Sequence, residues 1–239
     1  MTTLPHCFPA SLPVIIIPRN VSVFDCADGS SGIGLHGDQT RDRPEMLGVE
    51  RGHFFSEFNR LGGVQVLGYP ASNTFTLPDG FIYQTTQAAL LQWHPEDQPG
   101  GAVEMANVYD MLSKAGRDKD LQTLGIPPPI GDDGSGGNFQ RAVDVRLGWL
   151  TQPEIKKRFL ANPNPAAIKT WDAMSSIQLY GLPTSQPQRA GPYMVQRFQR
   201  VAFQLWLDAV PGQPAPGTVV PILGGDLAKR FAVVPVRWI

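Results

Sequence analysis

Residues 67–72 read LGYPAS and residues 180–185 read YGLPTS. In each stretch a glycine stands two residues before a proline and four residues before a serine. Glycine, proline and serine in this order are typical of a tight turn, because glycine allows positive φ, proline presets φ and serine hydrogen-bonds nearby backbone. An irregular turn that is written twice predicts that a structural unit occurs twice in the chain.

The similarity extends outward from both turns. Before the turn, at an offset of 113 residues, apolar and glutamine positions coincide: Val64, Gln65 and Val66 fall on Ile177, Gln178 and Leu179. After the turn the offset is 112, and three glutamines stay in register: Gln84, Gln87 and Gln92 fall on Gln196, Gln199 and Gln204. We therefore expect residues 50–115 and 163–231 to have the same backbone trace.

Each copy has signals for a helix, a turn, a β-hairpin and a second helix. In copy one, Phe54, Phe55, Phe58 and Leu61 form one apolar stripe of a helix that ends at Gly62. In copy two, Asn164 is expected as the N-cap of the first helix, with Pro165 at its first position. Apolar strand pairs predict hairpins, and closing helices are expected after them. The expected hairpins are 81–86 with 89–94 and 193–198 with 202–207, and the closing helices are 102–115 and 224–231.

These elements predict an α+β fold made of two homologous small units packed together. An N-terminal arm is expected over 1–45, repeat unit 1 over 46–124, and repeat unit 2 over 151–239. Residues 125–150 are expected to be a Pro/Gly-rich linker followed by a strand at 141–150, where apolar residues alternate. A unit of this size buries little surface alone, which favours packing of one against the other.

Composition excludes several classes of protein. The 239 residues carry a formal net charge of −1 without a basic stripe, so no nucleic-acid partner is expected. The longest apolar run, PVIIIP at 13–18, predicts a short strand and no transmembrane segment. The first residues lack the basic region of a signal peptide, which leaves an intracellular protein or an exported one whose signal was removed. Cys7 and Cys26 form either a disulfide or two free buried thiols, depending on the compartment.

The stretch LGYPASNTF, followed by DGFIYQTTQAALLQWHPE up to residue 96, resembles the LGFP-type repeats of bacterial envelope proteins. The resemblance implies an exported, non-catalytic module in the cell envelope that binds cell-wall glycan or another surface protein. Copy two departs from the repeat pattern, because Leu205, Trp206 and Leu207 follow its strand where copy one ends in Trp-His-Pro.

Catalytic and metal-binding patterns are weak. The four histidines, His6, His36, His53 and His94, lack the spacing of a zinc site, and no metal or cofactor is expected. Nucleotide-binding loops and a G-x-S-x-G nucleophile motif are absent. Glycoside hydrolysis needs two facing carboxylates, and Glu57, Asp79 and Glu96 are available. Their spacing in the sequence does not indicate which two of them would face each other.

Three functions follow as hypotheses. The first is the non-catalytic binding module, with ligand-binding residues Tyr69, Trp93, His94, Glu96 and Trp206, since aromatic rings stack on sugars. Both tryptophans also fit a purely structural role in the core. The second is a secreted hydrolase that uses Glu57, Glu96 or His94 between the two units, and the third is a structural surface-layer or filament subunit. A pocket between the units with convergent carboxylates would favour the hydrolase, and a flat aromatic surface would favour the binding module.

Overall fold

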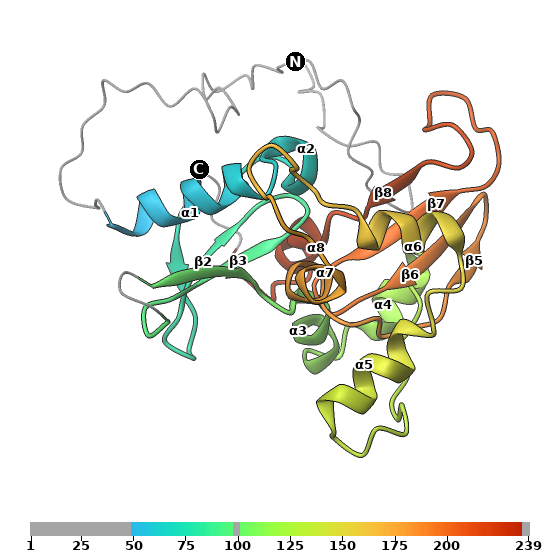
Figure 1. Cartoon of the computed structure of the whole chain (residues 1–239), viewed down its shortest axis with the longest axis horizontal. Helices are drawn as coiled ribbons and strands as arrows, with labels where there is room; N and C mark the ends of the chain where they lie inside the picture. Colours follow the sequence, from blue (N-terminus) through green and yellow to red (C-terminus); the bar gives the residue numbers. More distant parts are fainter. Residues whose placement is uncertain (1–48, 98–100, 236–239) are drawn as a thin grey trace, which may run out of the picture.

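The computed structural model describes residues 49–97 and 101–235, with helices and two antiparallel sheets (Figure 1). The helices are α1 (Val49–Arg60), α2 (Val64–Leu67), α3 (Val108–Lys114), α4 (Asp118–Thr123), α5 (Phe139–Leu147), α6 (Pro153–Leu160), α7 (Ala173–Tyr180) and α8 (Gly224–Arg230). The strands are β1 (Phe75–Thr76), β2 (Ile82–Thr85), β3 (Leu90–His94), β4 (Ala102–Met105), β5 (Gln188–Ala190), β6 (Tyr193–Arg197), β7 (Ala202–Trp206) and β8 (Val219–Pro221). The predicted α+β class is confirmed.

Each sheet is a meander in which neighbouring strands follow one another along the chain. Sheet 1 has the order β1-β2-β3-β4, and sheet 2 has the order β5-β6-β7-β8. Helix α1 packs against β3 and β4, and α6 packs against β7 and β8 (Figure 1). Helix α7 lies between the two sheets and contacts both β4 and α6. The predicted central hairpins, β2 with β3 and β6 with β7, are confirmed.

Two clusters of buried apolar side chains hold these layers. The first joins α1, α6 and α7 to one face of each sheet, through residues such as Phe54, Phe159 and Phe203. The second lies against the opposite faces and includes Tyr109 of α3 and Leu227 of α8. Both clusters contain side chains from both sheets, so neither sheet has a core of its own.

The repeated hexapeptides form equivalent turns. Gly68 has φ 72° and Gly181 has φ 75°, and a Cβ at either position would lie under 3 Å from a glutamine of the next hairpin. That glutamine closes the turn, because Gln87 Oε1 accepts from the Tyr69 N–H at 3.0 Å. In sheet 2, Gln199 Oε1 accepts in the same way from the N–H of Leu182 at 2.9 Å.

The two serines also make matching contacts. Ser72 Oγ accepts from the Thr85 N–H at 2.9 Å, and Ser185 Oγ accepts from the Arg197 N–H at 3.0 Å. Both serines are buried and serve the backbone of the hairpin. The recurring contacts are what a duplication predicts; common ancestry itself stays a prediction.

The helices that follow the two sheets make reciprocal contacts. The Tyr109 N–H in α3 donates to the Gln199 carbonyl of sheet 2 at 3.0 Å, and the Asp226 N–H in α8 donates to the Gln87 carbonyl of sheet 1 at 3.1 Å. Helices α3 and α8 also pack on each other. A Cβ on Gly225 would lie 1.9 Å from the Thr86 carbonyl, so only glycine permits this approach of α8 to sheet 1.

The predicted strand at 141–150 is wrong, because residues Phe139–Leu147 form α5. The Asn138 side chain accepts from the Arg141 N–H and caps this helix at its N-terminus. Ala142 and Val143 are both buried, which is a helical rather than an alternating burial pattern. The segment 125–138 before it is irregular, as expected for a linker.

Two predicted helix boundaries are also wrong. Asn164 begins only a single turn, and the helix of this region, α7, begins later with Asp172 as the N-cap that accepts from the Ser175 N–H at 2.7 Å. The Asn164 side chain instead donates to two carbonyls at the C-terminus of α1, those of Asn59 and Arg60. Residues 102–115 are a strand, β4, followed by the shorter helix α3.

Some expectations concern residues outside the described ranges. The N-terminal arm over 1–45, the strand at 13–18 and the Cys7–Cys26 disulfide lie there. Within the described ranges, no helix is both long and apolar enough to cross a bilayer.

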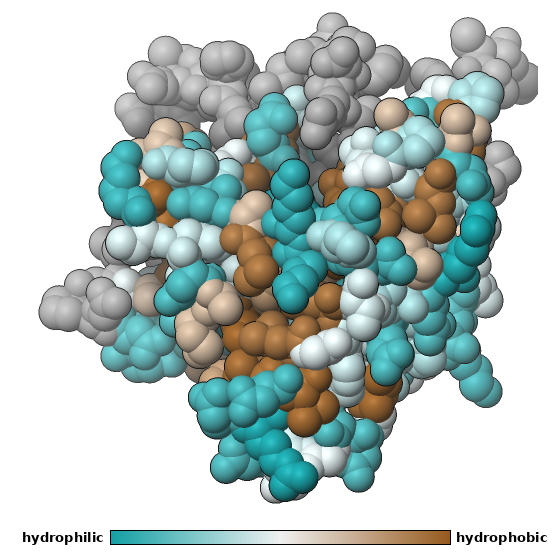
Figure 2. Space-filling model, turned by 45° about the vertical axis from the view of Figure 1, so that its right-hand side comes forward, coloured by the Kyte–Doolittle hydropathy of each residue, from teal (hydrophilic) through white to brown (hydrophobic). Residues whose placement is uncertain are grey.

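The expected apolar stripe of α1 is confirmed in part. Phe54, Phe58 and Leu61 are buried, whereas Phe55 is 56% exposed. Other large apolar side chains are also exposed, namely Ile130, Phe139, Leu160 and Met174. On the face drawn in Figure 2, apolar side chains gather in the middle of the molecule between polar borders.

A buried arginine ties sheet 2 to the helices that follow sheet 1. Arg197 in β6 is 0% exposed, and its guanidinium donates to Asp118 Oδ1 at 2.8 Å. It also donates to Ser113 Oγ at 2.6 Å and to the carbonyl of Tyr109. Removing this arginine is costly, because the buried Tyr109 carbonyl and the partly exposed Asp118 carboxylate lose their donor.

We predict that Arg197→Met lowers the free energy of unfolding by about 1–3 kcal/mol, because the buried Tyr109 carbonyl and the partly exposed Asp118 carboxylate lose their donor. Chemical denaturation monitored by circular dichroism measures this. The matched control is Arg189→Met in β5, whose exposed ion pair with Asp208 is worth less than about 1 kcal/mol. Equal effects of the two substitutions would contradict the assigned role of Arg197.

We also predict a pH dependence from Asp226. Burial raises the pKa of its carboxyl to about 6, and Lys229 opposes the rise. The folded chain then keeps this proton up to about pH 6, whereas the unfolded chain loses it near pH 4. Stability therefore falls as the pH rises between these values, by about 1–3 kcal/mol. Urea unfolding of the wild type and of Asp226→Asn from pH 4 to pH 7 should show the smaller decrease in the variant; parallel curves would refute the assignment.

Candidate functional site

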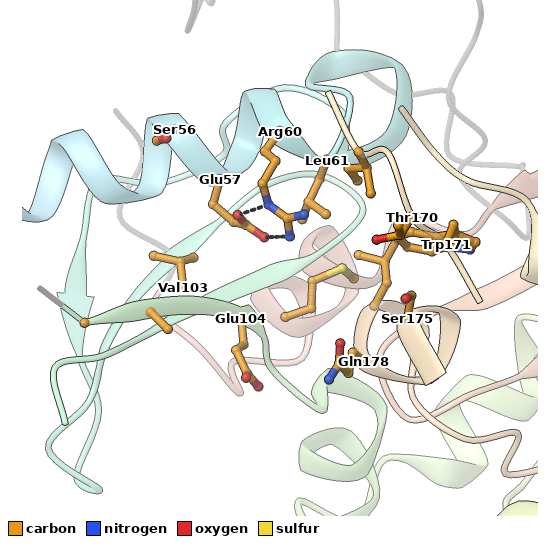
Figure 3. Close-up of a pocket in the computed structure, with 15 residues that line it drawn as sticks. Ser56, Glu57, Arg60, Leu61, Val103, Glu104, Thr170, Trp171, Ser175 and Gln178 are labelled. Carbon is orange, nitrogen blue, oxygen red and sulfur yellow. Dashed lines mark hydrogen bonds and ion pairs between the residues drawn. The ribbon is translucent and has the colours of Figure 1, made fainter. Parts of the chain in front are cut away.

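A cleft of about 650 Å³ lies between sheet 1 and the elements that precede sheet 2 (Figure 3). Its walls come from α1, from the strand β4, from residues 168–171 and from α7. The lining residues are Ser56, Glu57, Arg60, Leu61, Gly101, Ala102, Val103, Glu104, Met105, Ile168, Thr170, Trp171, Ser175, Gln178 and Leu179. The cleft therefore depends on the packing of both predicted repeat units.

An ion pair lies on the α1 wall. Arg60 donates through two nitrogens to the two carboxylate oxygens of Glu57, each at 2.6 Å (Figure 3). The two residues are one helical turn apart. The hydrogen bond to Glu57 is the main reason that the pKa of Arg60 is raised. The Glu57 carboxylate is thus held in place at the cleft rather than free.

A second carboxylate, that of Glu104, comes from β4. Its side chain is about half exposed, and it lies 3.6 Å from the Arg200 guanidinium. Arg200 is itself held by Asn107 Oδ1 at 2.9 Å and by the carbonyl of Gln178. Burial lowers the pKa of Arg200, and the charge of Glu104 opposes this. Both carboxylates of the cleft consequently have an arginine partner.

The wall opposite β4 is polar at its rim and apolar at its base. Thr170 and Gln178 are exposed and carry a hydroxyl and an amide, whereas Leu179 is buried. Trp171 is half-buried, and its indole N–H donates to Ser176 Oγ at 3.0 Å. The capping of α7 by Asp172 fixes this wall, since the N-cap residue directly follows Trp171.

The predicted ligand-binding residues do not line this cleft. Tyr69 lies in the turn after α2, where its backbone N–H is used by Gln87. His94 and Glu96 form a separate surface group: His94 Nδ1 lies 3.0 Å from Glu96 Oε1, and the imidazole packs 4.7 Å from the ring centroid of Phe81. The pKa of Glu96 is lowered, mainly by a hydrogen bond from its own backbone N–H and also by the hydrogen bond with His94.

The two tryptophans of the hairpins are parts of the core. Trp93 is half-buried and packs against the first apolar cluster, opposite Val103 in β4. Trp206 is only 3% exposed, and its ring lies edge to face on Tyr193 at 5.4 Å between centroids. Its burial leaves no ring face open to a sugar, which favours the structural interpretation of Trp206 over its assignment as a ligand-binding residue.

Of the residues that line the cleft, only Glu57 was a functional candidate from the sequence. The signal for Gln178 was present, because Gln178 repeats Gln65, but it was used only to align the copies. Arg60, Glu104 and Thr170 stand in segments that carry no motif. Among the described residues, no group of three or more His, Cys, Asp or Glu side chains could hold a metal ion.

Comparisons of this chain with family models, with curated proteins and with solved structures gave no significant match. The resemblance to LGFP-type repeats therefore rests on the quoted motifs alone.

We predict that Trp206→Ala lowers the free energy of unfolding by about 3–5 kcal/mol, the usual cost of removing a large buried ring. Thermal unfolding measures the change. Gln122→Ala, at an exposed position of α4, serves as the control and should change stability by less than about 0.5 kcal/mol. A stable Trp206→Ala protein that loses only ligand binding would show that Trp206 belongs to a site.

Proposed function

We propose that the chain is a non-catalytic binding module of the bacterial cell envelope, and that its partner lies in the cleft between the two sheets. The partner is a cell-wall glycan or another surface protein. The envelope location comes from the resemblance of residues 67–96 to LGFP-type repeats, and the binding site comes from the cleft.

The observation that carries the proposal is the chemistry of the cleft wall. It combines hydroxyl, amide and arginine-paired carboxylate groups with one half-buried indole. Such a set recognises a partner that is rich in hydroxyl or amide groups, since every polar group can donate or accept a hydrogen bond. A volume of about 650 Å³ is within the ordinary range of ligand sites.

A hydrolase is the second candidate, because two carboxylates line the cleft between the units: Glu57, which that hypothesis named, and Glu104, which it did not. Hydrolysis of a glycosidic bond needs one carboxylic acid that protonates the leaving oxygen. Glu57 is instead held by the two-point contact with Arg60, and Glu104 has Arg200 near it. Glu96 and His94, the other expected catalytic residues, lie outside the cleft. The ion pairs favour binding over catalysis.

We predict that the double substitution Thr170→Ala with Gln178→Ala weakens binding of the partner by roughly tenfold or more, because two polar contacts of about 1 kcal/mol each are lost. Cosedimentation with purified cell walls and, separately, with an extracted surface-protein fraction measures binding to the two partner classes. Both side chains are exposed, so the fold should be unchanged.

The matched control is Gln122→Ala together with Thr123→Ala, an exposed pair in α4 away from the cleft, which should bind like the wild type. Unchanged binding in the cleft variant would contradict the proposal. Release of reducing sugar from cell walls that disappears in Glu57→Gln or Glu104→Gln would establish the hydrolase instead.

A further inference from the structure

One wall of the cleft is the edge of a β-sheet. Five consecutive residues, 101–105, line the cleft, and four of them form β4, the last strand of sheet 1 (Figure 3). The other side of β4 is paired with β3 through the register Leu91–Met105 to His94–Ala102. The backbone of β4 therefore lines the cleft together with its side chains.

The ladder fixes which backbone groups face the cleft. The N–H of Ala106 points toward β3 and donates to the Leu90 carbonyl at 2.8 Å. Successive N–H groups along a strand point to opposite sides, so those of Val103 and Met105 point away from β3. Within the described part of the chain, no hydrogen-bond partner is recorded for these two outward N–H groups.

Sheet 2 provides an internal comparison. There the N–H of Ile222 donates to the Ala202 carbonyl at 2.8 Å, just as that of Ala106 donates to Leu90. Pro221 pairs with Phe203 as Met105 pairs with Leu91, so proline occupies the equivalent position at the edge of sheet 2. Proline has no N–H and is a common means of blocking an edge strand. The edge of sheet 2 is blocked at this position, whereas the edge of sheet 1 keeps its donor.

We propose that β4 receives an extended segment of a partner protein as an additional strand of sheet 1, with the N–H groups of Val103 and Met105 as donors to its backbone. The inference rests on the proposed binding function and selects the protein among its two partner classes. Addition of a strand to an exposed edge is a common mode of peptide recognition.

The walls of the cleft select a single extended segment rather than a second copy of the sheet. Helix α1 carries Glu57 and Arg60 above β4 in the view of Figure 3, and α7 carries Ser175 and Gln178 beyond the Glu104 end of the strand. Both helices line the same cleft as β4, so a neighbouring sheet would have to fit between them, whereas a single strand needs less room. Four strand residues span about 13 Å at roughly 3.3 Å per residue, which matches a segment of four or five residues.

The side chains of such a segment would alternate between two environments. Those directed toward α1 meet the Glu57–Arg60 ion pair, and those directed to the opposite face meet Glu104. Charged and polar side chains at alternate positions of the segment therefore find a partner. A glycan offers no regular series of carbonyl groups at the spacing of a strand, which is why the edge favours a polypeptide.

The test is a selection of random linear heptapeptides, displayed on phage, against the whole chain, followed by affinity measurements with the selected synthetic peptides. We expect binding peptides whose affinity falls at least tenfold in Met105→Pro, because one backbone donor is removed. The fold already accepts proline at the equivalent position 221. Met105→Val shortens the same side chain but keeps the N–H, and it should bind within about threefold of the wild type.

A second measurement uses only the wild-type chain and decides the matter even if Met105→Pro does not fold. Methylation of single backbone nitrogens in a selected peptide should abolish binding at every second residue and leave it nearly unchanged at the residues between them. Peptides that bind Met105→Pro as well as the wild type, or a methylation pattern without alternation, would overturn the inference. So would a selection that yields no peptide. Cell walls that bind in a manner dependent on Thr170 and Gln178 but not on Met105 would overturn it too, while the proposed binding function would survive.

Discussion

The structure depends on a reciprocal contact between its two sheets. The helix after each sheet begins against the turn of the other sheet's central hairpin: the N–H of Tyr109 donates to the carbonyl of Gln199, and that of Asp226 donates to the carbonyl of Gln87. The same glutamines hold the turns that contain Gly68 and Gly181, through their side-chain oxygens. Gln87 in sheet 1 and Gln199 in sheet 2 thus each make two contacts, one with the turn before their own hairpin and one with the helix that follows the other sheet. The repeated sequence therefore stabilises each unit and also the packing of the two units.

The cleft is a consequence of that pairing. The cleft has walls from α1 and β4, which pack together with sheet 1, and a wall from α7, which precedes sheet 2 in the chain. Its shape therefore requires that the two sheets keep their relative position. Buried groups such as Arg197, which connects β6 to α3 and α4, reinforce the position. Preorganised walls reduce the entropy lost when a partner binds. A rigid pairing of two small sheets therefore suits the proposed binding function.

Much of the fold could be predicted from local chemistry. The turns, the central hairpins and the helix α1 carry signals in adjacent residues: glycine, proline and serine in the turns, and apolar periodicity in the helix. The segment around Val143 and Val145 could not be assigned from periodicity alone, because a short apolar run fits either period. Its helical state is set by the Asn138 cap and by burial of neighbouring side chains. The strand β4 lies in the segment 102–115, for which a helix was predicted. It is a strand because it pairs with β3, and the segment's own sequence does not reveal that pairing.

The site could not be predicted to the same extent, because its residues come from four segments that only tertiary packing brings together. The two tryptophans that the sequence suggested as ligand-binding residues, Trp93 and Trp206, pack in or against the core. Arg60 and Gln178, which line the cleft, stand in segments without a binding motif. The proposed binding role of the β4 edge depends on a comparison of Met105 with Pro221 in the two sheets. That comparison requires the strand register, which no sequence pattern gives.

Native-state hydrogen exchange of two backbone amides tests the central claim most directly. If the reciprocal contacts hold the sheets together, the amides of Tyr109 and Asp226 exchange only through the global opening that also exposes the central strands β3 and β7. The free energies of exchange should then be equal within error. Exchange of either amide through a separate local opening several kcal/mol below the global value would contradict the account.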